Sequence, residues 1–238
     1  MARVEIPARE RLIFAMDVPN ADAARRLADT LGDSVSFYKL GLELFMAGDT
    51  FELLDWMVGC GKRVFVDLKF FDVPATVAGA VRNLRNRGVT FATVHGNQSI
   101  MEAAVAAAGD VGILAVTVLT SLDRGDLDDL GFKCDVGALV LSRARRALAA
   151  GCAGVVSSGL EAKLLRAGVD DRLIVVTPGI RPVENRPTDD QKRVMSVPEA
   201  FVNGADYIVV GRPIRDAADP RAAAEQIQAT IAGLFPGR

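Results

Sequence analysis

Eight short apolar runs alternate with segments of helical pattern along this chain, and the alternation limits the fold more than any other feature. The runs are rich in β-branched residues, and several are apolar on both faces, as in strands of a parallel sheet covered on both sides. They occupy residues 12–16, 35–40, 64–68, 91–94, 113–119, 154–156, 173–176 and 207–210. The rhythm predicts parallel strands joined by helices.

The segments between the runs favour helices because Ala, Leu and Arg recur at helical spacing. The clearest are residues 21–31, 42–58, 76–87, 99–108, 137–149 and 221–234, and several are followed by a glycine suited to a helix C-cap, namely Gly32, Gly59, Gly88, Gly109 and Gly151. No Pro/Gly/Ser-rich linker divides the 238 residues. We therefore predict a (β/α)8 TIM barrel forming a single domain over residues 1–238. A doubly wound open sheet is less favoured, because no G-x-G-x-x-G follows the first strand.

Composition and charge exclude several classes of protein. Half of the residues are apolar and 24% are charged, which fits a soluble globular protein, and the net charge of −2 argues against a nucleic-acid or anionic-membrane binder. The three cysteines, Cys60, Cys134 and Cys152, form no C-x-x-C pair, so we interpret them as small buried residues of a reduced cytosolic protein. No signal-peptide pattern or membrane-spanning run is evident, and we expect a cytoplasmic location.

Charged residues end the third apolar run, where a buried strand would place them at the edge of the core. Asp67 and Lys69 are two residues apart, so on a strand their side chains point to the same face, and Asp72 follows before Pro74 opens a helix. Buried charges are costly unless they are paired. This cluster of charges therefore indicates a catalytic site.

Polar residues follow most of the other predicted strands as well. In a (β/α)8 barrel the C-terminal ends of the strands form the active site, so these residues should converge there. Together with Asp67 and Lys69 of the third strand, the expected set is Asp17, Lys39, Thr120, Ser121, Arg181 and Arg212, with Gly211 beside Arg212. An alternating network of Asp17, Lys39, Asp67, Lys69 and Asp72 would keep each group ionised. A purely structural salt-bridge network is the alternative, which the location at one rim of the barrel disfavours.

The end of the chain carries a candidate phosphate site. Gly211 and Arg212 follow the eighth predicted strand, a common phosphate position in barrels, and an arginine adds charge-assisted contacts. A long polar loop around residues 179–197 could close over the phosphate, with Gln191 reaching the anion. A tight turn with a surface arginine and a solvated loop remain the alternatives.

The only histidine, His95, ends the fourth predicted strand. A general-base role is conceivable, but packing against a neighbouring strand is the preferred interpretation. One histidine and scattered cysteines disfavour a zinc site, whereas composition alone permits a magnesium ion bound by carboxylates.

Residues 67–76, with the sequence DLKFFDVPAT, resemble the D-x-K-x-x-D-I-P-x-T signature of the orotidine 5′-phosphate decarboxylases. Further segments similar to the bacterial form of this family follow in the family's order and cover almost the whole chain. They are residues 15–17, 38–41, 119–121, 178–181, 189–193 and 210–214.

The resemblance implies a reaction without metal or cofactor, in which orotidine 5′-phosphate gives uridine 5′-phosphate and carbon dioxide, the last step of de novo pyrimidine synthesis. It implies that Lys69 donates the proton to C6 of the pyrimidine and that Asp67 lies beside the substrate carboxylate. It also implies a homodimer in which Asp72 and Thr76 reach the site across the interface. The expected catalytic set is therefore Lys69, Asp67, Asp72 and Lys39.

The resemblance also assigns the groups that bind the substrate. Asp17 and Lys39 would bind the ribose hydroxyls, Thr120 and Ser121 the pyrimidine, and Arg181, Gln191, Gly211 and Arg212 the phosphate. The chain departs from many bacterial members at Phe71, where they have His, and at Ala75, where they have Asn. Neither position carries a proton in the implied scheme.

Two rival functions share the predicted fold. Hexulose-phosphate synthases and keto-gulonate-phosphate decarboxylases resemble this family, but they use magnesium and carry an acidic residue at the position of Lys39. A lysine there would repel the ion. The other rival is a non-catalytic sensor of phosphorylated ligands, which predicts loss of a charge from the network, whereas all five are present.

Overall fold

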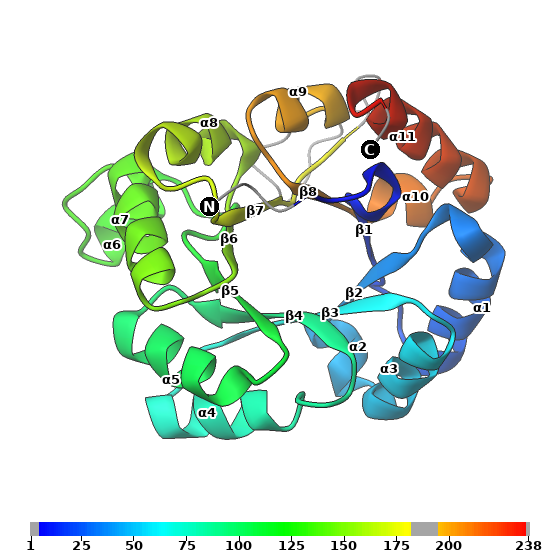
Figure 1. Ribbon diagram of the computed structural model, residues 1–238, viewed down its shortest axis with the longest axis horizontal. Coiled ribbons are helices and arrows are strands. Elements are labelled where there is room, and N and C mark those ends of the chain that lie inside the picture. The colour runs from blue at the N-terminus through cyan, green and yellow to red at the C-terminus, as the bar shows by residue number, and fades with distance from the viewer. Residues whose placement is uncertain (1–4, 182–194, 237–238) are drawn as a thin grey trace.

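The computed structural model describes residues 5–181 and 195–236. Eight parallel strands form a closed barrel in chain order, and the helices surround it (Figure 1). The strands are β1 (Leu12–Ala15), β2 (Phe37–Gly41), β3 (Arg63–Phe70), β4 (Val89–His95), β5 (Gly112–Val116), β6 (Gly154–Val156), β7 (Ile174–Thr177) and β8 (Tyr207–Val210). Strand β1 pairs with β8, with Ile13 opposite Val209. This closure confirms the predicted (β/α)8 barrel and rules out the open sheet.

The helices follow the strands around the barrel. They are α1 (Ala21–Leu31), α2 (Leu42–Met46), α3 (Thr50–Gly59), α4 (Pro74–Arg82), α5 (Gln98–Ala108), α6 (Arg124–Asp129), α7 (Val136–Ala149), α8 (Gly159–Gly168), α9 (Val197–Val202), α10 (Arg212–Arg215) and α11 (Pro220–Leu234), with the 3-10 turns η1 (Ala8–Glu10) and η2 (Gly32–Ser34). Side-chain caps begin several of them; Asn20 and Asp219, for example, accept hydrogen bonds from Ala23 N and Ala222 N. No helix within the described ranges is both long and apolar enough to cross a membrane.

The helix predicted over residues 42–58 is wrong in one respect, because the structure divides it into α2 and α3. Gly48 and Asp49 between them have φ of 88° and 55°. A right-handed helix cannot continue through two left-handed residues. Gly59 likewise does not serve as a C-cap: it lies at the end of α3, and Gly61, with φ of 73°, makes the left-handed turn instead.

The cysteines are not all buried, contrary to the prediction from the sequence. Cys152 is buried, but Cys134 is half-buried and Cys60 is exposed at the C-cap of α3.

Two apolar layers build the core. One lies between the sheet and the helices, and the other fills the barrel, because successive strand residues point to opposite faces. Aromatic side chains occupy the middle of the barrel; the ring centroid of Phe91 lies 5.6 Å from that of Tyr207 and 5.8 Å from that of Phe37. At the N-terminal end the guanidinium of Arg63 lies 4.4 Å from the centre of the Phe37 ring and pairs with Glu10. The aromatic layer therefore forms the floor beneath the C-terminal ends of the strands.

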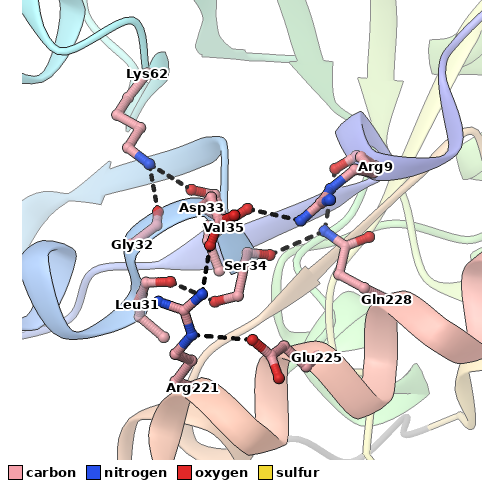
Figure 2. A network of polar contacts seen from close by, with 10 residues as sticks. All are labelled: Arg9, Leu31, Gly32, Asp33, Ser34, Val35, Lys62, Arg221, Glu225 and Gln228. Carbon is pink, nitrogen blue, oxygen red and sulfur yellow. Dashed lines mark hydrogen bonds and ion pairs between the residues drawn. The ribbon is translucent and has the colours of Figure 1, made fainter.

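A polar network joins the last helix to the first strand–helix units at the N-terminal end of the barrel (Figure 2). Gln228 of α11 donates hydrogen bonds from Nε2 to the carbonyls of Arg9 and Ser34, each at 3.1 Å. Arg221 forms ion pairs with Asp33 and with Glu225. These contacts fasten the closing helix at the end of the barrel opposite the strand ends where polar residues converge.

Candidate active site

A pocket of about 210 Å³ opens at the C-terminal ends of the strands. Its polar lining consists of Asp17, Lys39, Asp67, Lys69, Thr120, Arg181 and Arg212, together with the backbone at Gly179 and Gly211. Several of these residues continue the inward-facing series of their strand: Lys39 follows Phe37 by two positions, and Asp67 follows Phe65. The two-residue period of the strands therefore places charges directly above the aromatic floor.

The charges in the pocket alternate in sign. Lys39 Nζ lies 3.2 Å from Asp17 Oδ1 and 3.5 Å from Asp67 Oδ2, while Lys69 Nζ lies 3.0 Å from the same Asp67 oxygen. The Asp67 carboxylate is thus shared by two ammonium groups, and Lys39 bridges two carboxylates.

Neighbouring charges control the ionisation of the two most buried groups. Burial opposes ionisation of Asp67, but the ammonium groups of Lys39 and Lys69 outweigh it and hold the pKa of this carboxyl below its usual value. Burial also disfavours the Lys39 ammonium, but Asp67 and Asp17 outweigh that effect and raise the pKa of Lys39 above its usual value. Both groups are therefore charged at neutral pH.

Lys69 lies in a bulge of β3 against β4. Val66 pairs with Ala92 and Phe70 pairs with Val94, so Asp67, Leu68 and Lys69 on β3 face a single residue, Thr93, on β4. Lys69 has φ of 49°, in the left-handed region, although it is not a glycine. Bulges commonly re-aim side chains beside active sites, but they are rare between parallel strands.

Thr93 is a polar residue of this region that the sequence analysis missed. Its side chain is fully buried; Oγ1 donates to Asp67 Oδ1 at 2.9 Å and accepts a hydrogen bond from Lys69 N at 2.8 Å. The signal was the alternation along β4, because Thr93 lies two positions after the inward-facing Phe91. An inward threonine at the charged end of the barrel was a candidate for contact with the cluster.

The groups predicted to bind phosphate lie on another part of the pocket lining. Arg181 and Arg212 follow β7 and β8, and an added Cβ at Gly211 would lie 3.3 Å from the Ala15 side chain. Arg181 and Met195, which lie far apart in the sequence after β7, are neighbours in space: Arg181 N donates a hydrogen bond to Met195 O at 2.9 Å. Gln191 and the rest of the predicted phosphate-gripping loop, residues 182–194, lie outside the described residues.

Three predicted site residues do not line the pocket. Asp72, Thr76 and Ser121 are exposed, and the Asp72 carboxylate accepts a hydrogen bond from Val73 N at 2.6 Å. Phe71 and Val73, which flank Asp72, are 65% and 62% exposed although they are apolar. Within one chain Asp72 and Thr76 therefore lie on an apolar surface beside the charged cluster.

His95 packs on the rim rather than lining the pocket. Its ring lies 4.5 Å from the Phe71 ring, measured between centroids. Partial burial and the nearby Arg143 guanidinium lower the pKa of His95, which favours the neutral imidazole. Phe71 thus forms a ring contact with the only histidine of the chain.

Carboxylates and other ligand types do not gather into a metal cage in the part of the chain that the structure describes. No three His, Cys, Asp or Glu side chains in residues 5–181 and 195–236 are grouped as a metal ion would require. The two carboxylates of the pocket are instead bridged by the Lys39 ammonium.

Known proteins resemble this chain along nearly its full length. The model of the orotidine 5′-phosphate decarboxylase / HUMPS family matches residues 10–227. A protein of Methylococcus capsulatus named orotidine 5′-phosphate decarboxylase is 68% identical over 230 residues, covering 97% of this chain and 95% of that protein. One of the same name from Xanthomonas axonopodis pv. citri is 52% identical over 236 residues, covering 97% and 96%. The crystal structure of orotidine 5′-phosphate decarboxylase from Lactobacillus acidophilus superposes with a TM-score of 0.82 at 32% identity, covering 93% of this chain and 99% of that one.

Proposed function

The chain belongs to the orotidine 5′-phosphate decarboxylase / HUMPS family, and we propose that it converts orotidine 5′-phosphate to uridine 5′-phosphate and carbon dioxide. This is the last step of de novo pyrimidine synthesis. The observation that carries the proposal is the 3.0 Å pair of Lys69 and Asp67 in a pocket also lined by Arg181 and Arg212. The pocket thus combines a proton donor, a fixed carboxylate and guanidinium groups suited to a phosphate.

Lys69 supplies the proton that replaces carbon dioxide. Departure of carbon dioxide leaves an electron pair on C6 of the pyrimidine, and a fixed ammonium nearby stabilises that charge before it delivers the proton. The Lys69 side chain is 38% exposed at the pocket, so its Nζ is accessible to a bound ligand. In this scheme the reaction needs neither a metal nor an organic cofactor.

Asp67 lies beside the carboxylate that leaves. Because Lys39 and Lys69 keep it ionised, it repels the substrate carboxylate in the ground state, and this repulsion is relieved when neutral carbon dioxide forms. It also orients the Lys69 ammonium through the 3.0 Å contact. Asp67 is thus both a counter-ion of the proton donor and a neighbour of the scissile bond.

The remaining pocket groups hold the rest of the nucleotide. Of the residues that line the pocket, Asp17 and Lys39 bind the ribose hydroxyls, Thr120 contacts the pyrimidine, and Arg181, Gly211 and Arg212 bind the phosphate. We expect Ser121, which is exposed outside the pocket lining, to contact the pyrimidine as well, and Gln191, outside the described residues, to bind the phosphate. The binding energy of the phosphate, which is remote from C6, contributes to catalysis by organising the charged groups around the reacting carbon.

A second copy of the chain completes the site in this proposal. Asp72 and Thr76 are exposed on the surface beside the charged cluster, and the neighbouring Phe71 and Val73 are exposed apolar residues. An apolar surface of this kind favours association, and a homodimer would bring Asp72 and Thr76 to the pocket of its partner. We expect this dimer to act in the cytoplasm, without nucleic acid or membrane.

A magnesium-dependent hexulose-phosphate synthase or keto-gulonate-phosphate decarboxylase is the alternative function. The geometry at Lys39 disfavours it, because its ammonium lies 3.2 Å from Asp17 and 3.5 Å from Asp67 and would repel a divalent cation there. A non-catalytic sensor would not need the Lys69–Asp67 pair.

The test is to mix the purified protein with orotidine 5′-phosphate and a metal chelator and to follow the ultraviolet change to uridine 5′-phosphate. Rapid conversion supports both the reaction and its independence of metal. If the folded protein converts nothing, and instead acts on a hexulose phosphate after magnesium is added, the alternative function holds. The Lys69→Ala protein is the negative control for contaminating activity.

A further inference from the structure

We infer that Thr93 is a positioning residue for the Asp67–Lys69 pair, acting through the bulge between β3 and β4. The inference rests on the proposed function, because that function makes the pair the catalytic centre. Three residues of β3 lie opposite Thr93 alone, and the Thr93 hydroxyl bonds to the first and the last of them.

The Thr93 hydroxyl accepts a hydrogen bond from the Lys69 backbone and donates one to the Asp67 carboxylate. Thr93 Oγ1 accepts the Lys69 N–H at 2.8 Å, so its own hydrogen is free to be donated to Asp67 Oδ1 at 2.9 Å. The other carboxylate oxygen, Oδ2, then faces both Lys39 and Lys69. Thr93 is fully buried, so water does not compete for either bond.

The backbone of Lys69 needs such support. With φ of 49°, Lys69 adopts a left-handed conformation that costs free energy in a residue with a Cβ. The bond from its N–H to Thr93 stabilises this conformation, which directs the Lys69 side chain back toward Asp67 instead of along the strand. Loss of that bond would allow Lys69 to relax to negative φ and would move its ammonium away from Asp67.

Valine is the substitution that separates hydrogen bonding from packing, because it has nearly the shape of threonine but no hydroxyl. Thr117 offers a matched control: it is also fully buried, follows the next strand β5, and donates to Val156 O at 3.1 Å, but it does not line the pocket. Thr93→Ser keeps the hydroxyl and loses only a methyl group.

The experiment measures kcat for orotidine 5′-phosphate and the Kd of uridine 5′-phosphate in Thr93→Val, Thr93→Ser and Thr117→Val. We expect Thr93→Val to lower kcat at least about tenfold, the effect of losing a hydrogen bond to a charged group in the transition state. The Kd of uridine 5′-phosphate should change little, because the residues proposed to bind its phosphate and ribose follow or lie on other strands. Thr93→Ser should restore most of kcat, and Thr117→Val should keep it.

A wild-type kcat in Thr93→Val would overturn the inference, as would an equal kcat loss in Thr117→Val, which would indicate a general packing defect. A crystal structure of Thr93→Val tests the geometry independently of the reaction. Lys69 at negative φ supports the positioning role, and an unchanged Lys69 backbone and Asp67 rotamer refute it. A wild-type protein without decarboxylase activity would instead refute the proposed function, so the two failures are distinguishable.

Discussion

The Lys69 ammonium and the Asp67 carboxylate lie 3.0 Å apart, yet the Lys69 side chain is 38% exposed and the Asp67 side chain only 11%. The carboxylate is held above the aromatic floor by Thr93 and Lys39, whereas the ammonium extends toward the opening of the pocket. Poor hydration of Asp67 strengthens its field at the position of a bound ligand. The pair therefore combines a fixed negative charge with an ammonium group that a ligand can reach.

Lys69→Ala should nearly abolish turnover, by about a thousandfold or more, because it removes the proposed proton donor and, with it, the charge proposed to stabilise C6. The Kd of uridine 5′-phosphate should change little, since the phosphate and ribose contacts remain. Steady-state kinetics and titration calorimetry on the same preparation measure the two quantities. A variant that retained a tenth of the wild-type kcat would rule out Lys69 as the proton donor.

Two inactive variants should restore each other if Asp72 acts across a dimer interface. Lys69→Ala and Asp72→Ala, mixed and allowed to exchange subunits, form mixed dimers in which one site carries both changes and the other carries neither. Random exchange should therefore recover roughly a quarter of the wild-type activity. Exchange is verified separately with tagged subunits, and recovery must be absent when either variant is incubated alone. Demonstrated exchange without recovery would contradict the shared site.

Sequence alone predicted the barrel because its determinants are local. Each strand overlaps a short, mostly apolar run of the sequence, and β6 and β8 have the predicted bounds, Gly154–Val156 and Tyr207–Val210. The charges at the strand ends also follow from chain order, because a barrel brings all such ends to one rim. The pocket accordingly contains Asp17, Lys39, Asp67 and Lys69 from three different strand ends.

Other features depend on contacts between distant residues and could not be predicted in this way. The bulge at Lys69 arises from the register of β3 against β4, which no local pattern specifies, so Thr93 was missed. The division between α2 and α3 depends on Asp49 adopting φ of 55°, which is uncommon for a non-glycine residue. The roles of Asp72 and Thr76 require a second chain and remain predictions.

Arg212→Ala should weaken binding of phosphorylated ligands selectively. Loss of a charge-assisted contact to phosphate should raise the Kd of uridine 5′-phosphate about 10- to 100-fold, while the affinity for uridine stays the same. Arg172→Ala is the matched control, since Arg172 pairs with Asp170 on the surface and does not line the pocket. Equal losses for nucleotide and nucleoside would show that Arg212 does not bind the phosphate.

The charged cluster should make the free energy of unfolding depend on pH under acidic conditions. Lys39 and Lys69 hold the pKa of Asp67 below its usual value, so the unfolded chain binds a proton at higher pH than the folded protein does. The contribution of Asp67 is present above about pH 4, the unfolded pKa, and is lost as pH falls through the folded pKa. Urea unfolding at several acidic pH values should therefore show a smaller loss of stability for Asp67→Asn than for wild type. Parallel curves for Asp67→Asn and wild type would contradict the assignment.

Gln228→Ala should lower stability without affecting catalysis, because Gln228 belongs to the network at the end of the barrel opposite the pocket (Figure 2). The substitution leaves the carbonyls of Arg9 and Ser34 without their side-chain donor, at a cost of about 1–2 kcal/mol. For a chain of this size that corresponds to a decrease in Tm of roughly 2–8 °C, measurable by calorimetry. Gln226→Ala on the same helix is the control, since Gln226 is exposed and its substitution should leave Tm nearly unchanged. If both variants had the wild-type Tm, the network would not stabilise the barrel; a decrease in kcat for Gln228→Ala would show instead that fastening α11 also shapes the pocket.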